Sequence, residues 1–357
     1  MKKIFSFFAV LTVLLFGLNA CHNELQPVEK PTVTHSLKFV AEAPSTKTTA
    51  DIDTDNKTVD YSWTKDDEDR FMVYEINGEV YTPAITVVGD LTEGKMSLIA
   101  DFGGDSVPGA SYIALFNTGV KSEQSATGST YDQQSDVLIS KPVTSQNIED
   151  EILELRFKRE TAFALMTAKN LEGSSIIGAS IVADKKIVAE YDVKSQSFLE
   201  PGSKTIAIAN GDNAVSSISN GTADVFFASV PVEGTSLKVR VVTCDENGAF
   251  KALYEKSFAS GKSIDFARGD VRPFGIQMAK CEDGLTIDLT KDETTTATEN
   301  EMSWKIPGFV SVVAAKAGSS TPANNFYPGK GDGNTHFFTN STLTFTPRKG
   351  VLIGSIV

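Results

Sequence analysis

The residue types that most often form catalytic or metal centres are few and scattered in this sequence of 357 residues. There are three histidines, His22, His35 and His336, and the first two have no setting typical of a metal or catalytic site. His336 lies near the glycine-rich stretch 329–334, which includes Asp332. That stretch does not follow a predicted strand and open a helix, as a phosphate-binding loop does. The sequence therefore predicts no metal ion and no cofactor.

Acidic and thiol groups give no clearer centre. The run 66–69, Asp-Asp-Glu-Asp, offers oxygen ligands of the kind that Ca²⁺ prefers, but it lacks the ligand spacing of an EF-hand loop. A solvated turn is the favoured interpretation. Cys244 lies beside a turn with no nearby histidine, which favours a structural role over a nucleophilic one. A hydrolase would need a nucleophile, a base and an orienting group at a convincing spacing, and none can be named. We therefore predict that the chain is not an enzyme.

The first twenty residues have the layout of a secretory signal. Lys2 and Lys3 precede an apolar run from 4 to 18, and Leu18-Asn19-Ala20-Cys21 follows. The run is shorter than the roughly twenty residues that a transmembrane helix needs. A cysteine directly after a small residue at this point resembles the lipobox of bacterial lipoproteins, in which the cysteine is acylated. We therefore predict a signal peptide over 1–20, lipidation at Cys21 and a polar tether over 21–34.

Charge and cysteine content narrow the possible partners. Removal of residues 1–20, which hold two lysines and no acidic residue, takes the formal net charge from −13 to −15. A chain this acidic repels nucleic acid, so we predict no nucleic-acid partner. An exported setting permits a disulfide between Cys244 and Cys281, although their positions alone do not establish one.

Strands with alternating apolar and polar residues dominate the rest of the chain. Leu153, Leu155 and Phe157 alternate with charged residues, and Asn77-Gly78 marks a hairpin. Strands at roughly ten-residue spacing predict an all-β fold of tandem β-sandwiches. We place one sandwich over 35–150, with a surface loop at 118–134, and a second sandwich over 151–278.

The C-terminal part is predicted to be a partial β domain whose aromatic residues allow two interpretations. A linker over 279–300 leads to a partial β domain over 301–357, which we expect to be incomplete in this sequence. Its aromatic residues could form a sugar-stacking platform or a core; they are Trp304, Phe309, Phe326, Tyr327, Phe337 and Phe338. Its last residues, with Val351, Ile353 and Ile356, form an apolar strand that could be donated to a partner.

Several segments together resemble the fimbrillin-like lipoproteins of Bacteroidetes. The resemblance covers about 21–278, and its segments are Leu37–Ala41, Thr46–Thr49, Tyr61–Thr64, Phe71–Tyr74, Phe226–Pro231, Leu237–Val242, Gly261–Ser263 and Arg268–Asp270. It implies a lipoprotein signal and two tandem sandwiches. In polymerising members, a protease removes an N-terminal strand after a basic residue, and a partner's strand fills the groove. Lys47 is the better cut site here, because Arg70 begins a predicted core strand.

These observations lead to one main functional expectation and one alternative. The main one is a surface-exposed protein of the cell outer membrane that acts in adhesion or as a fimbria-like component. Its partners would be the membrane, through its lipid, and other fimbrial subunits or surface ligands of host or bacterium. The alternative is a surface lipoprotein that binds glycans through Trp304, Phe326 and Tyr327. Arg268-Gly269-Asp270 is interpreted as a turn into a strand rather than as a recognition motif.

Overall fold

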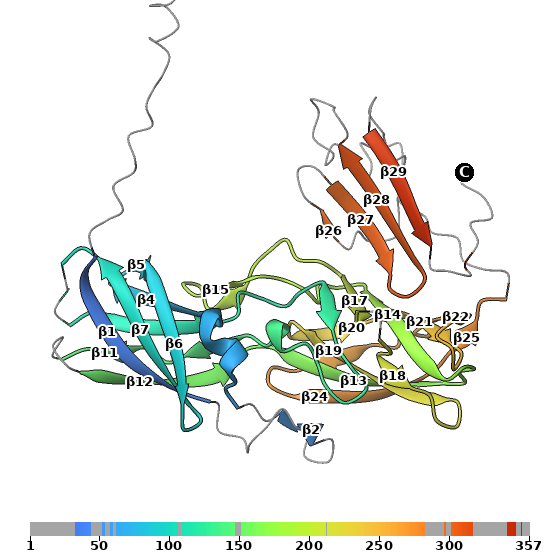
Figure 1. Ribbon diagram of the computed structural model, residues 1–357, viewed down its shortest axis with the longest axis horizontal. Coiled ribbons are helices and arrows are strands. Elements are labelled where there is room, and N and C mark those ends of the chain that lie inside the picture. Colours follow the sequence, from blue (N-terminus) through green and yellow to red (C-terminus); the bar gives the residue numbers. More distant parts are fainter. Residues whose placement is uncertain are drawn as a thin grey trace, which may run out of the picture.

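The computed structural model of the chain is nearly all β. It describes residues 33–43, 52–53, 58–59, 62–105, 107, 109–146, 151–211, 213–282, 296–297, 301–316, 341–347 and 351. Within these residues the helices are two short 3-10 turns, η1 (Lys65–Arg70) and η2 (Gln133–Ser135). The expected all-β class of packed sheets is confirmed (Figure 1).

The first sandwich is one continuous sheet folded into two layers. Its strand order is β5-β4-β8-β10-β12-β1-β7-β6, with β11 beside β8. The bounds are β1 (Val33–Glu42), β4 (Phe71–Asn77), β5 (Val80–Pro83), β6 (Thr86–Thr92), β7 (Lys95–Gly103), β8 (Ser111–Phe116), β10 (Leu138–Ser140), β11 (Val143–Thr144) and β12 (Ile152–Arg159). Strand β12 joins the layers, since its first half pairs with β1 and its last residues pair with β10. A small hairpin of β2 (Ile52–Asp53) and β3 (Thr58–Val59) follows β1 in the chain.

Alternation along these strands fills the core between the layers. Leu37, Phe39 and Ala41 of β1 are at most 1% exposed, while their neighbours Ser36 and Lys38 are exposed. Trp63 packs edge-on against Phe71 and other rings of the same core. Strand β12, which we had placed at the start of the second sandwich, completes this core instead. Its alternation was recognised, but alternation does not say which sheet a strand joins.

The second sandwich packs a three-stranded sheet against a larger one. The first sheet has the order β19-β13-β24 and the second β25-β22-β21-β14-β17-β9, with β18 beside β14. The bounds are β9 (Glu123–Ser125), β13 (Ala162–Lys169), β14 (Ser175–Ala183), β17 (Thr205–Ala209), β18 (Ser216–Ser217), β19 (Thr222–Ser229), β21 (Leu237–Cys244), β22 (Phe250–Ser257), β24 (Val271–Gln277) and β25 (Ala279–Lys280). Two small pairs complete it: β15 (Tyr191–Asp192) with β16 (Ser197–Phe198), and β20 (Val232–Thr235) with β23 (Ile264–Phe266).

The segment 118–134, expected as a surface loop, is instead part of the second sandwich. It carries β9, which pairs in parallel with β17, and its residues Val120, Ala126 and Tyr131 lie in the core of that sandwich. The segment reads as a loop because serine, threonine and glutamine dominate it. Its few apolar residues are nevertheless buried, and the side chain of Gln124 is bonded to Ala228, far along the chain.

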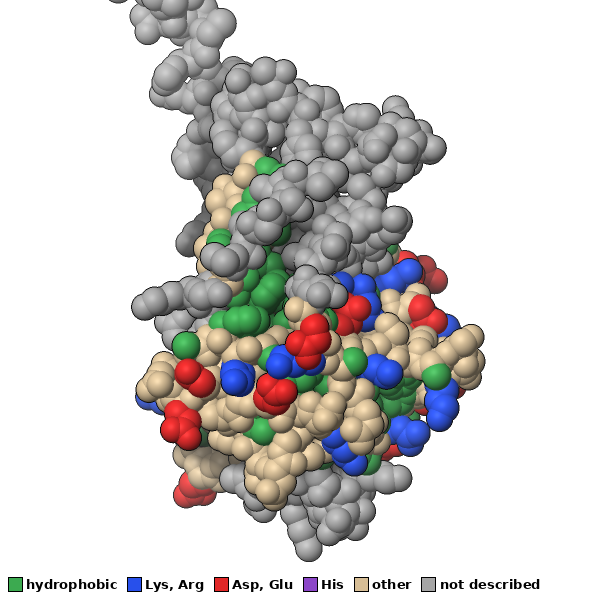
Figure 2. Space-filling view, turned by 90° about the vertical axis from the view of Figure 1, so that its right-hand side faces the viewer, with side chains coloured by type: hydrophobic (Ala, Val, Ile, Leu, Met, Phe, Trp, Pro, Cys, Tyr) green, Lys and Arg blue, Asp and Glu red, His purple; other side chains and the backbone are tan. Residues whose placement is uncertain are grey.

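A four-stranded sheet near the C-terminus stands on the second sandwich (Figure 1). Its strands are β26 (Thr296–Ala297), β27 (Glu301–Ile306), β28 (Val310–Lys316) and β29 (Ser341–Pro347). Ile306, Val310 and Val312 pack on the outer side of β14, β21 and β22, around Ile177 and Val242. Figure 2 shows hydrophobic side chains gathered where this sheet meets the sandwich.

Candidate functional site

The N-terminal strand β1 occupies an interior position in the first sandwich. It runs antiparallel to β7 on one side and parallel to β12 on the other, with Phe39 opposite both Leu98 and Leu153. The indole N–H of Trp63 donates a hydrogen bond to the carbonyl of Ala41 (2.9 Å). Strand β1, the first of the described residues, therefore fills a slot between two other strands instead of lying at an edge.

A polar bridge holds the beginning of β1 to the opposite layer. His35 stacks on Phe102, and its two ring nitrogens lie 3.2 Å from the Gly104 carbonyl and 3.3 Å from a Glu75 carboxylate oxygen. The hydroxyl of Tyr112 donates to the same Glu75 oxygen (2.9 Å). Burial, with the adjoining Glu75 carboxylate, raises the pKa of Tyr112 well above its usual range. Each layer thus contributes to a contact that fixes one end of β1.

The two sandwiches are joined by a strand that crosses between them. Strand β9 follows β8 in the chain but adds to the edge of the second sandwich at β17. The buried side-chain amide of Gln124 bonds main-chain groups of Ala228 on β19: it accepts from the Ala228 N–H (2.8 Å) and donates to its carbonyl (2.8 Å). Gln124 thereby acts as a peptide group at the free edge of β19 and connects the two sheets.

Replacing Gln124 with alanine is expected to lower the free energy of unfolding by about 2–4 kcal/mol. Two buried main-chain groups of Ala228 would each lose a partner, at roughly 1–2 kcal/mol apiece. Urea unfolding followed by tryptophan fluorescence measures the change. Ser125→Ala on the same strand is the control, because Ser125 is exposed, and it should change stability little. Equal effects of the two substitutions would contradict the role given to Gln124.

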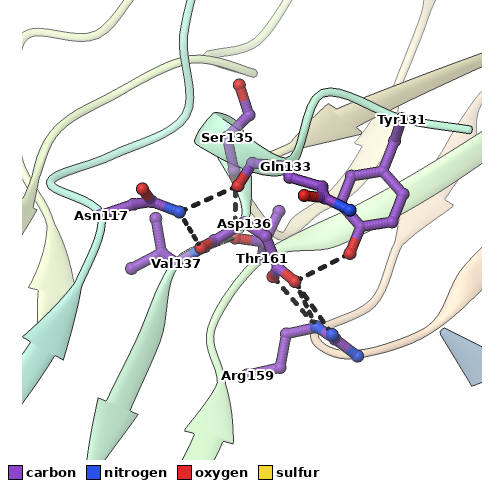
Figure 3. Close-up of polar contacts among 8 residues, drawn as sticks. All are labelled: Asn117, Tyr131, Gln133, Ser135, Asp136, Val137, Arg159 and Thr161. Carbon is purple, nitrogen blue, oxygen red and sulfur yellow. Dashed lines mark hydrogen bonds and ion pairs between the residues drawn. The ribbon is translucent and has the colours of Figure 1, made fainter. Parts of the chain in front are cut away.

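A buried carboxylate lies at the centre of the junction between the sandwiches (Figure 3). Asp136 is 0% exposed and accepts a two-pronged contact from the Arg159 guanidinium, with both atom pairs at 2.9 Å. The Tyr131 hydroxyl also donates to Asp136 (3.0 Å), and the Asn117 amide donates to its main-chain carbonyl (2.7 Å). Nearby, the Thr161 hydroxyl accepts a hydrogen bond from the Val137 N–H (2.7 Å). Burial and the Asp136 charge raise the pKa of Tyr131.

A second buried carboxylate lies one residue beyond Arg159. Glu160 is 0% exposed and its oxygens lie 3.0 Å from the Lys158 ammonium and 2.9 Å from the Arg268 guanidinium. Burial, together with the Glu160 charge, raises the pKa of Tyr191. Arg268 belongs to the Arg-Gly-Asp tripeptide, which turns into β24 as expected. Because the Arg268 guanidinium is paired with the buried Glu160, the tripeptide has a structural role at this junction.

An apolar cluster completes this junction. Ile113, Leu115 and Ile139 from the outer side of the first sandwich pack against Tyr191 and Val193 of the second. With the crossing strand and the two buried carboxylates, this cluster joins the tandem sandwiches and lies between their two separate cores. Polar residues at this junction escaped sequence analysis because their partners lie far along the chain. The one available signal was an unusual run of polar residues broken by single apolar ones.

The residues singled out from the sequence have different outcomes. Cys21, Phe326, Tyr327, Ile353 and Ile356 lie outside the described residues, as do His22, His336 and Lys47. Trp304 is in β27, but its side chain is not among those described, and Val351 is half-buried and in no strand.

Other predicted positions can be placed. Phe309 packs with Phe250 (ring centroids 5.7 Å apart) in the apolar cluster under the C-terminal sheet, so it belongs to a core. Cys244 and Cys281 are free thiols in that cluster, and burial raises the pKa of Cys281. The acidic run is η1, where Asp67 is buried and paired with Arg70 (3.0 Å) rather than solvated.

Among the described residues, no group of three His, Cys, Asp or Glu side chains is arranged to hold a metal ion. No helix in this part of the chain is long and apolar enough to cross a membrane. A cleft of about 600 Å³ lies beside β9 and the β27–β28 turn, and Lys121, Ser125, Phe309 and Pro347 are in its wall.

Comparison with known proteins adds structural neighbours only. No family model matches the chain, and no curated relative matches it. It is similar to a "putative cell adhesion protein" from Bacteroides ovatus, at TM-score 0.40 and 10% identity, covering 70% of this chain and 96% of that one. Another protein of that description, from Bacteroides uniformis, has TM-score 0.37 and 11% identity, with 68% and 91% covered. A fimbrial assembly protein from Parabacteroides distasonis has TM-score 0.32 and 12% identity, with 67% and 90% covered.

Proposed function

We propose that the chain is a lipid-anchored protein of the cell outer membrane, displayed on the cell surface. It serves in cell adhesion or as a structural or tip component of a fimbria-like assembly, and it joins other subunits or surface ligands through β-strand edges. Catalysis is no part of this proposal. The proposal is in keeping with the names of the solved structures above, and it rests on the position of β1.

Strand β1 lies where a strand that is exchanged between subunits would have to lie. It is the first strand of the described chain, and it lies between β7 and β12 with its apolar side chains in the core. Loss of β1 would leave a slot with main-chain groups of two strands on its walls and an apolar floor. An extended segment of another subunit could fill that slot through the same main-chain hydrogen bonds.

Limited digestion with a lysine-specific protease tests this use of β1. We expect a cut after Lys47, followed by growth of oligomers larger than any that the uncut chain forms, because a partner's strand can then replace β1. Size-exclusion chromatography with light scattering measures the conversion, and Lys47→Gln should abolish it. A chain that is cut after Lys47, loses β1 and forms no species larger than the uncut chain at any concentration would remove strand exchange from the proposal.

Surface display has its own test. On intact cells, added protease is expected to digest the wild-type protein, and Cys21→Ala is expected to release it from the cell, since acyl chains contribute roughly 0.8 kcal/mol per buried methylene. Immunoblots of cell and medium fractions measure both effects. Protection on intact cells that disappears on lysis would place the protein in the periplasm instead. A mutant that stays bound would contradict the role of Cys21.

A further inference from the structure

Large apolar side chains remain exposed in a row on one outer face of the first sandwich. Val88, Ile99 and Ile152 keep 60%, 46% and 62% of their surface exposed. They come from β6, β7 and β12, and strand pairing aligns them: Val88 lies opposite Ile99, Ile99 opposite Lys38 of β1, and Lys38 opposite Ile152. Single exposed apolar residues are ordinary, whereas adjoining ones indicate an interaction surface. We call the outward-facing residues of β6, β7, β1 and β12, this row included, the outer face.

The outer face is electrically neutral although the chain is strongly acidic. Its exposed and half-buried alternate positions hold four basic and four acidic residues: Lys38, Lys95, Arg156, Lys158, Glu42, Asp90, Asp101 and Glu154. The chain as a whole has a formal net charge of −13. Two copies therefore repel each other over most of their surface, but not where two outer faces meet.

Most of these charges already have partners within the outer face. Lys95 lies 3.8 Å from Glu42, and Arg156 lies 3.1 Å from Glu154. Asp101 accepts hydrogen bonds from the hydroxyls of Ser36 (2.6 Å) and Thr86 (2.7 Å), which lower its pKa. Covering a charge is costly mainly when it is left unpaired. This face can therefore be covered at a lower cost than one with isolated charges.

We propose that the outer face binds the outer face of a second copy of this chain. A two-fold axis along the strands would lay β6 of one copy over β12 of the other, so that Val88 meets Ile152 and Ile99 meets the methylene stem of Lys38. Sheet faces pack in this way at a separation of about 10 Å. The contact itself does not require the proposed lipid anchor. The anchor would only strengthen it, because anchoring in one membrane raises the effective concentration of the copies.

Cysteine cross-linking in membranes tests the contact with the full chain. Ser97→Cys, near the axis, is made in a Cys281→Ser background and treated with a short bifunctional thiol reagent. We expect a product of twice the chain's mass, and we expect it to be lost when Ile99→Lys is added, because a charge would enter the row. The control is Thr82→Cys, an exposed position on β5 in the other layer, whereas Ser97 is half-buried. It should give no such product.

Three outcomes would overturn the proposal: no product from Ser97→Cys, equal products from both cysteine positions, or a product whose mass shows a different protein. If the chain proves not to be anchored, sedimentation of the purified full chain decides the matter separately. Dimerisation that rises with concentration and is lost in Ile99→Lys supports the contact without the anchor. A wild type that stays monomeric at every concentration overturns it.

Discussion

Replacing Asp136 with alanine is expected to lower the free energy of unfolding by about 3–5 kcal/mol, the range for removing one partner of a buried ion pair. The carboxylate is 0% exposed and receives hydrogen bonds from Arg159 and Tyr131. Without it, the guanidinium of Arg159, whose side chain is 7% exposed, would lose its carboxylate partner in the protein interior. Chemical denaturation followed by circular dichroism measures this loss.

The same substitution is expected to uncouple the two sandwiches. Asp136 lies between η2 of the crossing segment and β10 of the first sandwich, so its contacts belong to both. We expect one cooperative unfolding transition in the wild type and two separate transitions in the variant. Asp69→Ala, at an exposed aspartate of the first sandwich, is the control and should leave a single transition. A single unchanged transition in Asp136→Ala would contradict the coupling role given to Asp136.

Local patterns predicted the strands well because alternation is a local property. The hairpin at Asn77-Gly78 is present, although its turn residues are Gly78 and Glu79, with Asn77 paired to Val80. Gly78 has φ +59°, a conformation that glycine adopts without strain. The strands containing Phe39 and Phe157 were also found from their alternating residues.

The junction could not be predicted in the same way. Gln124 and its partner Ala228 are 104 positions apart, and nothing local distinguishes a glutamine that replaces a peptide group from one in a loop. Asp136 likewise depends on Arg159, which a sequence pattern shows only as a charged residue in an alternating strand. Polar residues that are satisfied by distant partners have no periodic signature, so composition made the segment 118–134 look like a surface loop.

Replacing Phe39 with alanine is expected to lower the free energy of unfolding by about 3–5 kcal/mol, the usual cost of removing a buried phenylalanine ring. Phe39 is 1% exposed and contacts the ring of Tyr112 edge-on, at 5.8 Å between centroids. Urea denaturation measures the loss. Lys38→Ala is the matched control, because Lys38 is the next residue on β1 and its side chain is exposed on the opposite face.

This substitution also separates two requirements of the proposed strand exchange. A strand that is to be replaced must be held until the chain is cut at Lys47. A donor strand must then compete with the side chains of β1 for the same slot. After cleavage at Lys47, we expect Phe39→Ala to release the N-terminal fragment faster than the wild type and Lys38→Ala to release it at the wild-type rate. The fragment that co-elutes with the cut chain measures retention. Equal retention in all three proteins would mean that the apolar contacts of β1 do not control its exchange, and that the His35 bridge or the main-chain hydrogen bonds do.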